Sequence, residues 1–160
     1  MTNGLIGGVF HWTGGIYKPN THELECYHFL IDGNGKIHKG IYAPEDNIDC
    51  KDGRYAHHTG GGNTGRIAIA FCGEMNEAYP LKQIQIEAGC KLASELCKKY
   101  YIPINGWTTH MEFGEAHPDT TSHGKPDIYH LPCSHISGYK NVGNYLRSKI
   151  KWYYDKETSK

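Results

Sequence analysis

Histidine is the residue type most able to do chemistry in this chain, which contains 11 histidines among 160 residues. It is the commonest metal ligand and the main acid–base side chain near neutral pH. Three positions stand out by context: His11 at the end of an apolar stretch, His110 after Trp107-Thr-Thr, and Asp127 within Gly124-Lys-Pro-Asp-Ile128. A catalytic zinc ion usually has three protein ligands and an open fourth position for water. Two histidines and one carboxylate fit that pattern.

Spacing alone leaves other interpretations open. His11 also fits a half-buried imidazole with satisfied hydrogen bonds, and His110 also fits an ordinary loop residue. The sequence lacks the HExxH pattern of helical zinc proteases. Two further groups of potential metal ligands are closely spaced in the sequence. The first comprises His117, Asp119 and His123, and the second comprises His130, Cys133 and His135. The neighbours His57 and His58 should point to opposite sides of an extended chain, so at most one should face a given cleft.

The elements that must position these residues begin with four apolar, β-rich stretches. They are Leu5–Trp12, Cys26–Ile31, Lys36–Tyr42 and Arg66–Cys72. The turn sequence Asp32-Gly-Asn-Gly35 predicts that the second and third stretches form an antiparallel hairpin. Within the last stretch the apolar residues are continuous rather than alternating, which predicts a central strand covered on both faces.

Apolar residues that recur every three or four positions predict two helices. The first stripe runs from Leu81 to Tyr100 and the second from Val142 to Tyr153. Between them, residues 105–139 have no clear periodicity, and a long irregular segment in a compact domain is usually functional. We therefore predict one α/β domain over residues 1–154, with a central mixed β-sheet flanked by helices, and a polar tail at residues 155–160.

Composition excludes several classes of protein. Lys plus Arg and Asp plus Glu both number 17, so no strong field of one sign favours nucleic acid or an anionic membrane. The longest apolar runs, such as Ile67–Cys72, are too short to span a bilayer. Residues 1–15 contain no Lys or Arg, which argues against a secretory signal. We expect a soluble monomer, synthesised in the cytoplasm with its six cysteines as free thiols and without stable membrane association.

Five short motifs, taken in order, resemble one family. The motifs are Val9-Phe-His-Trp-Thr13, Tyr27-His-Phe-Leu-Ile31 with Asp32-Gly33, Ala56-His-His-Thr-Gly60 with Asn63 and then Ile67-Ala-Ile-Ala-Phe71, Thr109-His-Met-Glu112, and Gly124-Lys-Pro-Asp-Ile128 with Leu131-Pro132. Together they resemble the zinc-dependent N-acetylmuramoyl-L-alanine amidases, the family shared by phage lysozyme-type amidases and peptidoglycan recognition proteins. The resemblance implies the fold of that family.

The resemblance also implies a metal centre with one Zn²⁺ per chain. His11 matches the first zinc ligand, His110 the second, and Asp127 the third, a position that the family fills with Cys or Asp. Lys125 matches the lysine that steadies the transition state. One departure is the interval between His110 and Asp127, which is longer than in compact members, so the loop with His117 and His123 is an insertion.

Three further residues receive roles from the same resemblance. Tyr27 matches a catalytic position that is Tyr in some members and Glu in others. His58 matches a histidine of the substrate cleft. Trp12 stands where a second histidine or a small residue is frequent, so we expect it to alter the wall of the substrate-binding cleft.

The resemblance therefore predicts hydrolysis of the amide between N-acetylmuramic acid and L-alanine in peptidoglycan or muropeptides. We expect a phage endolysin that reaches the cell wall after release by a holin. A bacterial cytoplasmic amidase that recycles muropeptides is an alternative with the same chemistry. A non-catalytic peptidoglycan-binding module is an alternative from another class, and it would keep the groove but lose the metal ligands.

Overall fold

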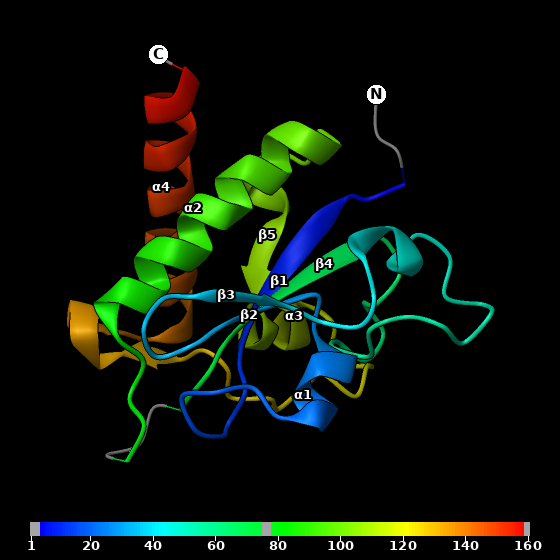
Figure 1. Ribbon diagram of the computed structural model, residues 1–160, viewed down its shortest axis with the longest axis horizontal. Helices are drawn as coiled ribbons and strands as arrows, with labels where there is room; N and C mark the ends of the chain where they lie inside the picture. Colours follow the sequence, from blue (N-terminus) through cyan, green and yellow to red (C-terminus); the bar gives the residue numbers. More distant parts are fainter. Residues whose placement is uncertain (1–3, 75–77, 159–160) are drawn as a thin grey trace.

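The computed structural model describes residues 4–74 and 78–158 and shows a five-stranded sheet with helices around it (Figure 1). The strand order is β3-β2-β4-β1-β5. Strands β2, β4, β1 and β5 are parallel to their neighbours, and β3 pairs antiparallel with β2. The strands are β1 (Gly7–Trp12), β2 (Phe29–Ile31), β3 (Ile37–Lys39), β4 (Arg66–Phe71) and β5 (Trp107–Thr109). The predicted single α/β domain with a mixed sheet is confirmed.

The remaining elements are four α-helices, three short 3₁₀ helices and a two-stranded ribbon. The α-helices are α1 (Thr21–Cys26), α2 (Gln83–Tyr100), α3 (His110–Ala116) and α4 (Tyr139–Thr158). The 3₁₀ helices span Pro44–Asn47, Ile104–Gly106 and Pro132–Ser134, and the ribbon pairs β6 (His130–Leu131) with β7 (Ile136–Ser137). Within the described part of the chain, no helix has the length and apolar character needed to span a membrane.

The core lies between the sheet and the paired helices α2 and α4, which run side by side on one face (Figure 1). Phe10 stacks on Phe71 at a ring distance of 5.8 Å, and both rings belong to this core. The opposite face of β4 contributes Ala70, which packs with Leu24 of α1 and with Tyr27. Strand β4 is therefore central and covered on both faces, as its continuous apolar sequence predicts.

Side-chain alternation along β1 sets the position of the first candidate ligand. Because Phe10 points into the α2–α4 core, its neighbour His11 points to the other face of the sheet. The residue opposite His11 on β4 is Ala70, whose small side chain leaves room there. The hairpin is also confirmed, since Asp32 Oδ1 accepts backbone hydrogen bonds from Asn34 and Lys36 at 2.8 and 3.1 Å.

Several predicted boundaries differ from the structure. Strand β1 begins at Gly7, β3 spans only Ile37–Lys39, and β4 ends at Phe71. Cys26 and Tyr27 do not belong to a strand, because Asn20 and Glu23 form a capping box that starts a helix there. Tyr27 caps the end of that helix, and β2 begins only at Phe29. At the other end of the chain, α4 continues to Thr158, beyond the boundary predicted after residue 154. Residues 159 and 160 of the predicted tail lie outside the described residues.

Candidate metal centre

Three elements bring His11, His110 and Asp127 together. His11 lies near the end of β1, His110 is the first residue of α3, and Asp127 lies in the loop that precedes β6. The Nδ1 atoms of His11 and His110 both lie 3.2 Å from Asp127 Oδ2. All three side chains are buried, and their potential ligand atoms lie within 4.8 Å of one another. The structure thus collects the three predicted ligands, while their binding of zinc stays a prediction.

A second set of contacts fixes the start of α3, and with it His110. Thr109 and Glu112 form a capping box, with Thr109 N donating to Glu112 Oε1 at 2.9 Å and Glu112 N donating to Thr109 Oγ1 at 3.1 Å. Arg147 of α4 donates two hydrogen bonds of 2.8 Å to the carboxylate of Glu112. Met111 N donates to Asp127 O at 2.6 Å, which ties the ligand loop to the helix.

The electrostatics of the group favour a neutral, ligand-competent imidazole at His11. Burial lowers the pKa of His11 to about 4, so its imidazole is neutral at neutral pH and has a free lone pair. Burial alone would raise the pKa of Asp127, but its close contacts with the imidazoles of His11 and His110 outweigh burial and lower it. The site therefore offers two imidazole nitrogens and one carboxylate.

The distances also suit a tetrahedral ion. Zinc bonds of about 2.0–2.2 Å place neighbouring ligand atoms of a tetrahedron about 3.3–3.6 Å apart. The observed separations of 3.2 Å from Asp127 to each Nδ1 are close to that value. The three residues thus fit a zinc site through Nδ1 of both histidines and the carboxylate of Asp127.

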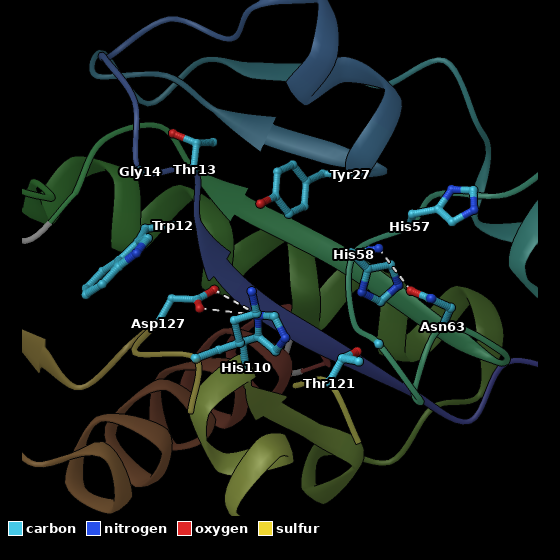
Figure 2. Close-up of a pocket in the computed structure, with 12 residues that line it drawn as sticks. Trp12, Thr13, Gly14, Tyr27, His57, His58, Asn63, His110, Thr121 and Asp127 are labelled. Atoms are coloured by element: carbon cyan, nitrogen blue, oxygen red, sulfur yellow. Dashed lines mark hydrogen bonds and ion pairs between the residues drawn. The ribbon is translucent and has the colours of Figure 1, made fainter. Parts of the chain in front are cut away.

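A pocket of about 490 Å³ is lined by two of the three candidate ligands, His110 and Asp127 (Figure 2), while the fully buried His11 is not part of its lining. Its lining combines aromatic rings, small polar residues and one cation, namely Trp12, Thr13, Gly14, Tyr27, His57, His58, Gly60, Asn63, His110, Thr121, Lys125 and Asp127. The predicted residues Trp12, Tyr27, His58 and Lys125 all line this pocket.

The two predicted catalytic side chains approach the group from different elements. The Tyr27 ring lies 5.0 Å from the His11 ring, and burial, followed by the nearby charge of Asp127, raises the pKa of its phenol. Tyr27 is therefore a neutral hydrogen-bond donor at neutral pH. Lys125 lies on the loop between α3 and β6 and is exposed, and no hydrogen bond or ion pair of its ammonium group occurs within the described ranges.

Trp12 packs edge-to-face against Tyr129, with ring centroids 5.9 Å apart.

The pair His57 and His58 departs from the expectation for an extended chain, because both residues line the pocket. Asn63 Oδ1 accepts from the backbone N–H of His58 and of Thr59, at 2.9 and 2.8 Å, and so bends the segment. His57 is exposed and packs on Tyr55. His58 is only 6% exposed and lies against His11, with 3.3 Å between His58 Nδ1 and His11 Nε2.

The two competing ligand groups do not form within the described part of the chain. In the first group, His117 Nδ1 lies 2.9 Å from the carbonyl oxygen of Phe113, and the exposed His123 lies 3.9 Å from Glu115. The second group, which comprises His130, Cys133 and His135, also fails to converge. All six cysteines are free thiols in the structure.

Sequence reasoning missed two hydroxyl residues beside the candidate ligands. Ser122 Oγ lies 3.0 Å from His110 Nε2, and Thr59 Oγ1 lies 3.4 Å from His11 Nε2. Thr59 stands beside His58 in a recognised motif, so its proximity could have been suspected. Ser122 lies in the aperiodic segment, where no local pattern distinguishes it from its neighbours Thr120 and Thr121.

Comparisons with known proteins agree with this geometry. Residues 7–127 match the family model described as N-acetylmuramoyl-L-alanine amidase. No curated protein sequence is similar enough to count as a match.

Among solved structures, a mutant of PlyL has a TM-score of 0.60 at 18% identity, covering 94% of this chain and 87% of that one. Drosophila peptidoglycan recognition protein SD has a TM-score of 0.50 at 22% identity, covering 68% of this chain and 69% of that one. The E. coli amidase AmiD also has a TM-score of 0.50, at 19% identity, and the match covers 69% of this chain and 49% of AmiD. At these identities, the likenesses establish the fold alone.

Proposed function

The chain belongs to the N-acetylmuramoyl-L-alanine amidase family, and from that membership we propose that it is a zinc-dependent peptidoglycan amidase. The bond cut is the amide between N-acetylmuramic acid and the L-alanine of the stem peptide. The observation that supports hydrolysis most strongly is the buried group of His11, His110 and Asp127 beneath an open pocket. A binding module has no need to gather three buried ligand atoms there.

The proposed chemistry divides among a metal ion and two side chains. A bound zinc supplies a Lewis acid that lowers the pKa of water to about 7 and polarises a carbonyl group. Lys125 places a positive charge beside the oxyanion that develops as the amide is attacked. Tyr27 is held as a neutral phenol by burial, so it donates a hydrogen bond to the same oxygen or to the departing group.

The substrate class is consistent with a muropeptide. AmiD, which has a similar fold, has been solved with anhydro-N-acetylmuramic acid-L-Ala-D-gamma-Glu-L-Lys. The pocket here mixes polar groups with the half-buried ring of Trp12, a lining that suits a ligand with sugar and peptide parts. We propose that Trp12 forms one wall of that binding site.

The biological setting that we propose is a phage endolysin that reaches the wall through a holin. A recycling amidase would share the chemistry but would act on small soluble muropeptides. Rates on purified cell walls and on a soluble muropeptide, measured side by side, separate the two. An endolysin clears a suspension of walls, whereas a recycling enzyme acts on the soluble muropeptide alone.

Product analysis tests the proposed reaction. Incubation with a defined muropeptide should release a peptide with a free L-alanine amino group, together with an intact sugar carrying its lactyl carboxylate. Mass spectrometry identifies both products. A non-catalytic recognition module would bind the muropeptide and return it uncut, and that result in the presence of added zinc would overturn the proposal.

A further inference from the structure

The outer ring nitrogens of both candidate ligands have specific partners. His110 Nε2 lies 3.0 Å from Ser122 Oγ, and Ser122 Oγ lies 2.8 Å from the carbonyl oxygen of Gly60. A carbonyl oxygen only accepts, so the hydroxyl proton of Ser122 is donated to Gly60. The lone pairs of Ser122 then accept the Nε2–H of His110, and this arrangement leaves the Nδ1 lone pair of His110 facing Asp127.

A similar chain of hydrogen bonds supports His11. His58 Nε2 lies 3.1 Å from the carbonyl oxygen of Arg66, so the single proton of a neutral His58 imidazole belongs on Nε2. His58 Nδ1 is then an acceptor, 2.7 Å from Thr59 Oγ1 and 3.3 Å from His11 Nε2. The hydroxyl proton of Thr59 then occupies the single lone pair of His58 Nδ1, so Thr59 Oγ1, 3.4 Å from His11 Nε2, is the acceptor left for the Nε2–H of His11.

We propose that His58, Thr59 and Ser122 are positioning residues that keep the ring protons of His11 and His110 on Nε2. In this tautomer the Nδ1 atom of each ligand presents its lone pair toward Asp127. The inference rests on the proposed function, because it assumes that these three residues hold the metal. It assigns His58 a role behind His11 in place of contact with substrate.

The position of Asp127 shows why such support is needed. Asp127 lies 3.2 Å from both Nδ1 atoms and would by itself attract a proton to each of them. Protons on Nδ1 would block the lone pairs that a metal requires. Acceptors at both Nε2 atoms oppose that shift and favour the metal-binding tautomer before the ion arrives. Groups with this role typically affect metal affinity by about 10–100-fold.

Burial argues that His58 serves the protein interior. Its side chain is almost fully enclosed, and both ring nitrogens have internal partners in Arg66, Thr59 and His11. No polar atom of the ring therefore remains for a sugar or peptide. Ser122 is completely buried in the same way, although the loop that carries it is largely exposed.

Zinc affinity of Ser122→Ala, measured by competition with a chromophoric chelator, tests the His110 side. We expect affinity to fall by about 10–100-fold. Ser94→Ala is the matched control, because Ser94 is equally buried and donates to the carbonyl of Lys91 in α2, away from the site. Ser94→Ala should bind zinc as tightly as the wild type. Equal affinity in Ser122→Ala and Ser94→Ala would overturn the role of Ser122.

The His11 side is tested by comparing His58→Asn with His58→Leu. Asparagine keeps an acceptor oxygen near the place of Nδ1, whereas leucine fills similar space without one. We expect His58→Leu to lose about 10–100-fold in zinc affinity and His58→Asn to lose clearly less. Thermal unfolding of the metal-free proteins shows whether both variants fold. Equal losses in two folded variants would contradict the proposed hydrogen bond.

A measurement on the unaltered protein keeps the proposal independent of folding defects. Nitrogen-15 NMR of the histidine rings in the zinc-loaded protein should show protonated Nε2 and metal-bound Nδ1 for both His11 and His110. Metal bound through Nε2 of either residue would overturn the inference. Failure of the wild-type chain to bind zinc at all would instead overturn the proposed function, so the two failures are distinguishable.

Discussion

The two histidines of the candidate site are held by different kinds of structure. His11 lies in the interior of the sheet, with β4 and β5 on either side of its strand and a packed aromatic core beneath. His110 begins a short helix whose position depends on polar contacts with Glu112, Arg147 and Ser122. The sheet side is therefore fixed by hydrophobic packing, and the loop side by a few hydrogen bonds.

The loop side reaches the sheet side through a close contact between two loops. The loop of residues 117–127 lies against the glycine turn at residues 60–62, where added side chains would collide with Thr121, Thr120 and Phe113. The glycines thus let the loop approach closely enough for Ser122 to reach the carbonyl of Gly60. The inner residues of this loop therefore dock at the glycine turn, while most of its other residues are exposed.

The largest expected effect comes from removing the ligand on the sheet side. His11→Ala should abolish stoichiometric zinc binding and reduce hydrolysis to background, because two protein ligands do not make a stable site. His57→Ala, an exposed neighbour in the same pocket, serves as a control for zinc content. Metal content and rate are measured on the same preparations. A full equivalent of zinc in His11→Ala would contradict the ligand assignment.

Lys125→Ala separates catalysis from metal binding on the loop side. An ammonium group cannot ligate a cation, so zinc and fold should be retained. Turnover should fall by about 10²–10³-fold, the scale for losing one oxyanion-stabilising donor. KM should change much less, because an interaction made only in the transition state affects the rate.

Steady-state kinetics on a soluble muropeptide, with zinc analysis, provide the test for Lys125. Turnover near the wild-type value would make Lys125 an ordinary surface charge. Loss of zinc would show that Lys125 matters for the shape of the loop rather than for charge.

The Arg147→Ala variant tests how far the position of α3, on the loop side, depends on polar contacts. Arg147 makes a partly buried, two-bonded ion pair with Glu112, so its loss should cost about 1–3 kcal/mol and loosen the start of α3. Lys151→Ala is the control, because its pair with Asp155 is exposed. Chemical denaturation measures both changes. Equal stability of the two variants would remove the proposed contrast between the sides.

The smallest effect is expected from reductant, which tests whether the sheet side needs a covalent link. All six cysteines are free thiols, and Cys72, Cys90 and Cys97 are buried in the two core clusters. Activity should be unchanged by reductant, and six thiols should titrate under denaturing conditions before reduction. A lower thiol count together with loss of activity in reductant would indicate a structural disulfide.

The sequence predicts the structure around His11 better than the structure around His110. The strands near His11 were recognisable because continuous apolar residues and an Asp-Gly-Asn-Gly turn are local signals. Strand β5 and helix α3 were missed, since each is short, although the capping box of Thr109 and Glu112 was visible in the sequence. The approach of Ser122 to Gly60 joins residues 62 positions apart, and no local pattern encodes such a contact.

Residue types alone also left three possible ligand groups open. His117, Asp119 and His123 lie much closer together in the sequence than His11, His110 and Asp127 do. Only the tertiary structure shows that His117 contacts Phe113 while His123 lies near Glu115. Asp127 was singled out by its motif and not by its spacing. The predicted start of the strand at Cys26 was wrong, because the capping box of Asn20 and Glu23 starts a helix that ends at Cys26.

The central claim is that this chain hydrolyses muropeptides through one zinc ion held by His11, His110 and Asp127. Its most direct test follows zinc content and hydrolysis rate together while a chelator removes the metal and measured zinc is added back. We predict one equivalent of zinc per chain, loss of activity with the metal, and recovery in proportion to zinc up to one equivalent. Full hydrolysis by protein that contains no metal would contradict the account.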